Sequence, residues 1–104
     1  MFENTQGIGK IVMDGRTHLF CPMGDDWYTA NIHIEIEGME TIPDYIDVTR
    51  FMEQMDGTSL IIEDACSMVH GFIVEQTHGD VTVSISVDDA RHIPVTVTIG
   101  GSNA

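Results

Sequence analysis

The sequence predicts an α+β domain in which a four-stranded antiparallel sheet carries two helices on one face, in the order β-β-α-α-β-β. Three segments alternate between apolar and polar residues, which is the pattern of half-buried strands. A region between the second and third of the four predicted strands has the helical period instead. The chain has 104 residues, so we expect one domain over residues 1–104 with an ordered core over about 8–100 and short tails.

The first two strands are predicted from the N-terminal third of the chain. A weaker strand is expected over residues 8–13 and continues over 17–20, with a break at the turn signal Asp14-Gly15. The strongest alternation follows over residues 30–37, where every second residue is Ala or Ile. This segment predicts a strand with one buried and one solvated face.

Two helices are predicted after these strands. Asp47 is a candidate N-cap for a short helix over residues 48–55. Thr58 or Ser59 is a candidate cap for a longer helix that runs to about residue 73. The apolar stripe of this second helix consists of Ile62, Ala65, Val69, Phe72 and Ile73.

The last two strands are predicted as a hairpin over residues 81–87 and 95–99, joined by the short connection 88–91. With both helices on one face, the sheet has two open edges, and only Pro94 protects the start of one of them. Pairing of these edges between copies would remove them, so we expect a homo-oligomer.

The chain is strongly acidic, with 17 Asp and Glu against 4 Lys and Arg and a net charge of −13. Such a surface repels phosphate backbones, so a nucleic-acid partner, tRNA included, is expected only at high salt. No apolar run has the length of a membrane span, and the first residues show no secretory signal. We therefore expect a cytoplasmic protein without a membrane partner, in which Cys21 and Cys66 are free thiols.

A carboxylate near the start of the longer helix, Glu63, is the candidate anchor for a flat heterocycle. A heterocycle with a ring N–H beside an NH2 group presents two parallel donors, and a carboxylate accepts both hydrogen bonds, each contributing about 1.5–3 kcal/mol. The alternative is an acid that only complements the helix dipole. Trp27 and Tyr28 could stack on the same ring or pack at the start of a strand.

Cys21 is the candidate nucleophile, followed by the acidic loop residues Asp25 and Asp26. A thiolate is a nucleophile, and a nearby carboxylic acid can deliver a proton as the new bond forms. The alternative for Cys21 is a small buried hydrophobic residue. His18 and His33 lack the spacing of a metal motif, so no metal site is expected.

These residues resemble the tunnelling-fold superfamily, and most closely the QueF-like 7-cyano-7-deazaguanine reductases with their short archaeal relatives that make archaeosine. Residues 19–32 are similar to the family's Cys-Pro, Asp-containing loop and Ala-x-Ile strand, and Ile62-Glu63-Asp64 matches two residues of its purine-binding His-Glu-Asp. The resemblance implies an oligomeric barrel that binds purines or pterins between subunits. It also implies Cys21 as nucleophile, Asp25 or Asp26 as proton donor and Glu63 as ring anchor.

The chain departs from the reductases where they bind nicotinamide. Residues 44–50 contain no Lys, and the late Arg-Gly-Gly run of the reductases is absent. We therefore expect no cofactor: NADPH remains conceivable, but its motif is not seen. The amidinotransferase-like archaeal relatives, which dispense with that motif, suit the chain better.

A weaker resemblance is to dihydroneopterin aldolase, over residues 43–47 and 60–63. The aldolase's Lys is missing here, since Lys10 is the only Lys in the chain. Two non-catalytic alternatives stay open: a purine- or pterin-binding or structural ring, and an acidic protein that mimics nucleic acid.

Overall fold

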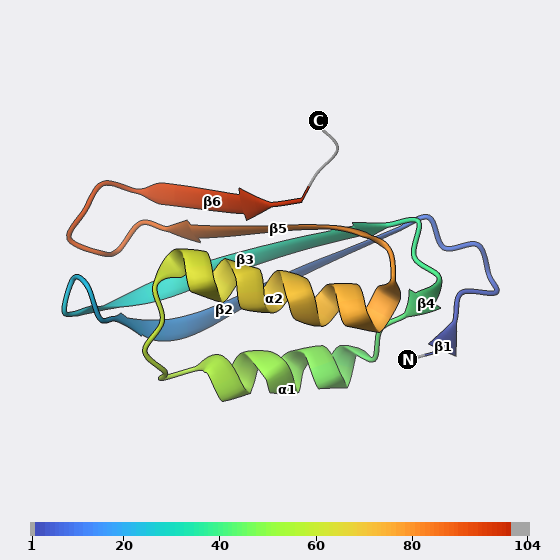
Figure 1. The fold of residues 1–104 in the computed structure, drawn as a ribbon, viewed down its shortest axis with the longest axis horizontal. Helices are drawn as coiled ribbons and strands as arrows, with labels where there is room; N and C mark the ends of the chain where they lie inside the picture. The colour runs from blue at the N-terminus through green and yellow to red at the C-terminus, as the bar shows by residue number, and fades with distance from the viewer. Residues whose placement is uncertain (1, 101–104) are drawn as a thin grey trace.

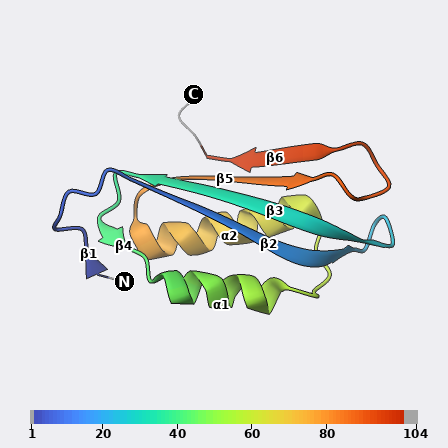
Figure 2. The ribbon, with the colours of Figure 1, turned by 180° about the vertical axis from the view of Figure 1, so that it is seen from behind.

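The structure, a computed structural model, describes residues 2–100. Its main sheet is antiparallel and has the order β2-β3-β5-β6, from β2 (Lys10–Cys21), β3 (Asp26–Glu37), β5 (Asp80–Val87) and β6 (Val95–Ile99). Two helices, α1 (Tyr45–Met55) and α2 (Ile62–Thr77), lie side by side on one face of this sheet (Figures 1 and 2). The predicted α+β class and element order are confirmed.

A second, small sheet adds to the predicted elements. It pairs β1 (Phe2–Glu3) with β4 (Thr41–Ile42), so part of the segment with tail composition is in a strand. The predicted C-terminal tail beyond Gly100 lies outside the described residues.

The core lies between the sheet and α2. The even-numbered residues of β3 from 28 to 36 are buried, as the alternating pattern predicts. They pack with Ala65, Val69 and Ile73 of α2 in one hydrophobic cluster. Each fully buried aliphatic side chain contributes about 1.5–3 kcal/mol, so this layer holds the helices on the sheet.

The predicted break at Asp14-Gly15 is wrong, because β2 continues through it. Asp14 pairs with His33 and Gly15 with Ile32 in an unbroken register. The regular partner strand β3 supplies a hydrogen-bond ladder along its whole length, and this ladder outweighs the local turn preference. Asp14 also contacts the ring of His33, with Oδ1 2.7 Å from Nδ1.

The first helix begins earlier than predicted. Asp44, not Asp47, is its N-cap, and the Asp44 carboxylate accepts a hydrogen bond from the Ile46 N–H at 2.9 Å. Asp47 lies in the first turn, where a carboxylate is favoured by the helix dipole. Both acids precede a helical pattern, and the choice between them depends on where the chain leaves Pro43, which is buried.

The second helix begins later and ends later than predicted. Neither Thr58 nor Ser59 caps it: it starts at Ile62 without a side-chain cap and continues through Gly71 to Thr77. The segment 57–60 instead lies along β2, where Phe20 N–H donates to the Thr58 carbonyl at 2.9 Å and Leu60 N–H to the Phe20 carbonyl at 3.0 Å. These long-range bonds replace the predicted cap.

One edge strand of the main sheet, β2, is partly covered by another segment of the chain. Gly57 N–H donates to the His18 carbonyl at 2.7 Å, so segment 57–60 covers the β2 edge at His18 and Phe20. Backbone groups on one edge of a strand recur every second residue, which leaves the edge open over Val12, Asp14 and Arg16. The expectation of two open edges therefore holds for only half of β2.

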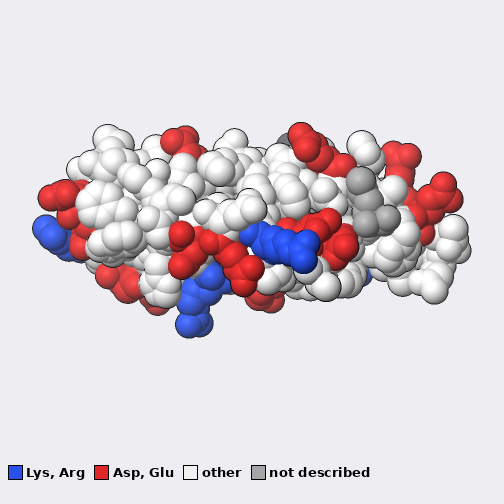
Figure 3. All heavy atoms as spheres, turned by 90° about the horizontal axis from the view of Figure 1, so that it is seen from below, with Lys and Arg blue, Asp and Glu red and all other residues white. Residues whose placement is uncertain are grey.

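Acidic side chains are dispersed over the surface. In the view from below, red groups extend along the whole length of the molecule and blue groups occupy few places (Figure 3). Across residues 2–100, no helix is both long enough and apolar enough to span a membrane.

Candidate functional site

Cys21 ends β2 on the side of the sheet that faces the helices. Its thiol is half-buried, and the Gly24 N–H of the following turn donates to Sγ at 3.4 Å. A cavity of about 80 Å³ adjoins it. The walls of this cavity come from the β2–β3 turn, the start of α2 and the β5–β6 connection: Cys21, Gly24, Asp26, Trp27, Tyr28, Ile62, Val87, Ala90, Arg91 and His92.

Tyr28 lines the same cavity as Cys21 and is hydrogen-bonded to the segment just before α2. Its side chain is 5% exposed, and its hydroxyl donates to the Leu60 carbonyl at 2.5 Å. Burial raises the pKa of the phenol to about 12, and the negative charges of Cys21, Glu63 and Asp64 add to the rise. Tyr28 and Cys21 therefore line one cavity, and the Tyr28 phenol is held by a backbone carbonyl just before α2.

Glu63 lies in the first turn of α2, directly after the cavity residue Ile62. Its side chain is exposed and has no hydrogen bond or ion pair with any other residue between 2 and 100. The helix dipole favours a carboxylate at this position. Glu63 follows a cavity residue in the sequence, but its own side chain is not part of the cavity wall.

The two acids of the loop differ in position. Asp26 lines the cavity: its Oδ1 accepts the Trp27 N–H at 3.0 Å, and its Oδ2 lies 3.3 Å from Arg91 Nε. Asp25 is exposed, has a φ of 52° and is absent from the cavity wall. Of the two residues that the sequence left as alternatives, Asp26 is the one beside Cys21.

Trp27 and Tyr28 point to opposite sides of β3, because successive residues of a strand alternate. The Trp27 side chain is 54% exposed, and its ring contacts Phe20 edge-on at a centroid distance of 5.4 Å. Tyr28 points into the core. Both residues nevertheless line the Cys21 cavity, so their stacking on a ligand stays a prediction.

The sequence interpretation missed the β5–β6 connection. Ala90, Arg91 and His92 form one wall of the Cys21 cavity, although the hairpin pattern predicted only a short link there. Basic residues are rare in this chain, which has 4 Lys and Arg, and this rarity could have drawn attention to Arg91. No local sequence pattern, however, relates residue 91 to residue 26.

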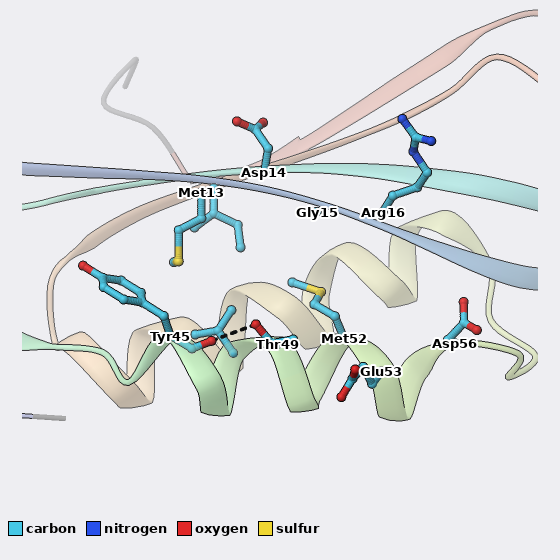
Figure 4. A pocket seen from close by; sticks show the side chains of 11 residues that line it. Met13, Asp14, Gly15, Arg16, Tyr45, Thr49, Met52, Glu53 and Asp56 are labelled. Carbon is cyan, nitrogen blue, oxygen red and sulfur yellow. Dashed lines mark hydrogen bonds between the residues drawn. The ribbon is translucent and has the colours of Figure 1, made fainter.

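A larger hollow of about 660 Å³ lies between β2 and α1 (Figure 4). Met13, Tyr45, Thr49 and Met52 line it, with charged groups such as Glu53 at its border. No predicted site residue lines this hollow, and its wall contains no thiol. We therefore place the candidate site at the smaller Cys21 cavity, where a thiol, a carboxylate and a buried phenol are close together.

The open face of the sheet carries a separate group of charges around His33. Its Nδ1 lies 2.7 Å from Asp14 and its Nε2 lies 2.8 Å from Glu35, which also pairs with Lys10 at 3.0 Å. Hydrogen bonds from the His33 ring to the carboxylates of Asp14 and Glu35 raise the pKa of His33. In the described part of the chain, no three His, Cys, Asp or Glu side chains are arranged to hold a metal ion.

Comparison with known proteins gives a likeness in structure. No family model and no curated protein matches the sequence. Among solved structures, the chain is similar to the archaeosine synthase QueF-Like in its apo form, with a TM-score of 0.84 at 10% sequence identity. The match covers 95% of this chain and 99% of that chain. The fold is therefore a tunnelling fold of the QueF-like type, as the resemblance predicted.

Proposed function

We propose that this protein binds a 7-deazaguanine or a related ring and that Cys21 adds to the nitrile of 7-cyano-7-deazaguanine. One observation carries the proposal: Cys21, Tyr28 and Ile62, the residue before Glu63, line the same cavity. That arrangement occurs in a fold similar to the archaeosine synthase QueF-Like. The fold gives the chemical context, and the site residues supply the nucleophile and the anchor.

The proposed reaction needs no oxidant or reductant. The Cys21 sulfur forms a bond to the nitrile carbon while one π bond of the nitrile breaks. The Asp26 carboxylate takes the proton of the Cys21 thiol and passes it to the nitrile nitrogen, so the product is a thioimide. Ammonia or an amine then adds to the same carbon and expels the Cys21 thiol, which leaves an amidine.

Glu63 would hold the ring by accepting hydrogen bonds from its N–H and NH2 groups. The cavity of about 80 Å³ is smaller than the roughly 300–1,000 Å³ of small-molecule sites. We therefore propose that a second copy completes the site in a homo-oligomer. The free half of the β2 edge, over residues 10–16, and the unpaired edge of β6 are the surfaces proposed to meet.

The test mixes the protein with saturating 7-cyano-7-deazaguanine and follows the near-ultraviolet absorbance of the thioimide. We expect an adduct that Cys21→Ala abolishes and that Cys66→Ala, the matched thiol control, leaves in place. Glu63→Gln should weaken binding by about tenfold or more, since a bidentate charged contact is lost. No adduct with the unmodified protein would refute the proposal.

A non-catalytic ring-binding protein is the second candidate, and the unpaired Glu63 carboxylate favours it independently of Cys21. Calorimetry against guanine, 7-deazaguanine and pterin separates the two functions. Binding that is lost in Glu63→Ala, together with no thioimide, would favour this second candidate.

A further inference from the structure

The β5–β6 connection, residues 88–94, lies across the Cys21 cavity and is attached to the start of β3 at two points. The Thr29 N–H donates to Asp89 Oδ1 at 3.0 Å, and Arg91 Nε lies 3.3 Å from Asp26 Oδ2. Hydrogen bonds from Thr29 lower the pKa of Asp89, so the first attachment favours a charged carboxylate. The second attachment is an ion pair between two residues that line the cavity.

The walls of this cavity differ in how firmly they are held. Tyr28 and Val87 are buried in the core, whereas the Arg91 side chain is 78% exposed and Ile93 is 79% exposed. Exposed ion pairs contribute little net stability and break readily. The connection is therefore the wall that can move at small cost, and its movement would enlarge a cavity of about 80 Å³.

We propose that Arg91 determines the size of the molecules that reach Cys21. Paired with Asp26, it keeps residues 88–94 across the cavity and admits only small molecules to the thiol. When the pair opens, the connection moves away and a ring-sized molecule enters. The identity of that ring rests on the proposed function, whereas the control of access concerns the thiol alone.

The experiment compares two uncharged thiol reagents in a Cys66→Ala background, so that only Cys21 reacts. Iodoacetamide is small, and 4,4′-dithiodipyridine carries two aromatic rings. Because neither reagent is charged, removal of a cation does not change their attraction to the site. The ratio of the two rates cancels any change in the reactivity of the thiol itself and reports access.

We expect Arg91→Gln to raise the ratio of the dithiodipyridine rate to the iodoacetamide rate by about two- to fivefold, the range of an exposed ion pair. Asp26→Asn should give the same gain, and the double variant no more, because both changes remove one interaction. Arg91→Lys should restore most of the closed state. Arg50→Gln is the matched control, since Arg50 pairs with Asp47 on α1.

An unchanged ratio in Arg91→Gln, or additive gains in the double variant, would overturn the proposal. The outcome is independent of the nitrile experiment. If the ratio rises but no thioimide forms, the control of access is supported and the proposed reaction is refuted. If a thioimide forms but the ratio is unchanged, the reaction is supported and the proposed role of Arg91 is refuted.

Discussion

The two faces of the main sheet are made from the same four strands but are held by different interactions. The covered face is apolar and packs against α2 through side chains such as Ile32 and Ile34. The open face is polar: Ser84 pairs with Thr98 at 2.9 Å, and His33 contacts two carboxylates. The difference indicates that burial supplies the stability of the fold, while the open face adds pairwise polar contacts. Cys21 lies at the end of the covered face.

The largest expected effect comes from the covered face. Ile34→Ala leaves a cavity in the core and should lower the free energy of unfolding by about 2–5 kcal/mol. Ser84→Ala, which removes one hydroxyl contact on the open face, should cost at most about 1 kcal/mol. Urea unfolding of both variants measures the difference. Equal losses would contradict the division of roles between the faces.

Tyr28 is buried on the covered face but keeps one polar contact, and its effect should be intermediate. Tyr28→Phe removes the hydrogen bond to the Leu60 carbonyl and should cost about 1 kcal/mol near neutral pH. The phenol has a pKa of about 12 when folded and about 10 when unfolded. Unfolding therefore releases a proton between these values, and the stability of the unmodified protein falls there.

The stability gap between the unmodified protein and Tyr28→Phe should thus narrow from about pH 10 to 12. Chemical denaturation at several alkaline pH values measures it. A gap that stays constant across this window would show that the phenol is not protected by the core.

The smallest expected effect belongs to the open face and depends on pH. The raised pKa of His33 means that its stabilising contribution is complete below about pH 6.5 and is lost as pH rises through the raised value. His33→Gln should therefore destabilise by at most about 1 kcal/mol at low pH and by less at high pH. Asp14→Asn should show the same trend. Thermal unfolding at pH 5.5 and 9 tests this sign, and a larger loss at pH 9 would contradict it.

The strands were predictable where the pattern is local. Residues 81–87 and 95–99 alternate, and β5 and β6 have nearly these bounds. The failures occur where distant backbone groups decide. Gly15 extends in a strand because Ile32 lies opposite, and Ser59 lies beside Phe20 instead of capping α2. Local preferences of about 1 kcal/mol yield to such long-range bonds.

The sequence suggests which chemical groups the candidate site contains, but not which residues enclose them. Cys21 and Glu63 could be named because a thiol and a helix-start carboxylate carry recognisable chemistry. The contact of Tyr28 with the Leu60 carbonyl and the pair of Arg91 with Asp26 join residues that are distant in sequence. No periodicity or motif encodes such contacts, so only the folded chain identifies them.

The segment 57–60 divides the outer edge of β2 into a covered part and an open part. At the end next to Cys21, the backbone groups of His18 and Phe20 are hydrogen-bonded to this segment of the same chain. The proposed association with another copy along this strand would therefore be confined to the far end, over residues 10–16. A fluorophore or a bulky substitution introduced there would test the proposed assembly without disturbing the backbone that carries the thiol, so the proposed assembly and the proposed chemistry can be tested one at a time.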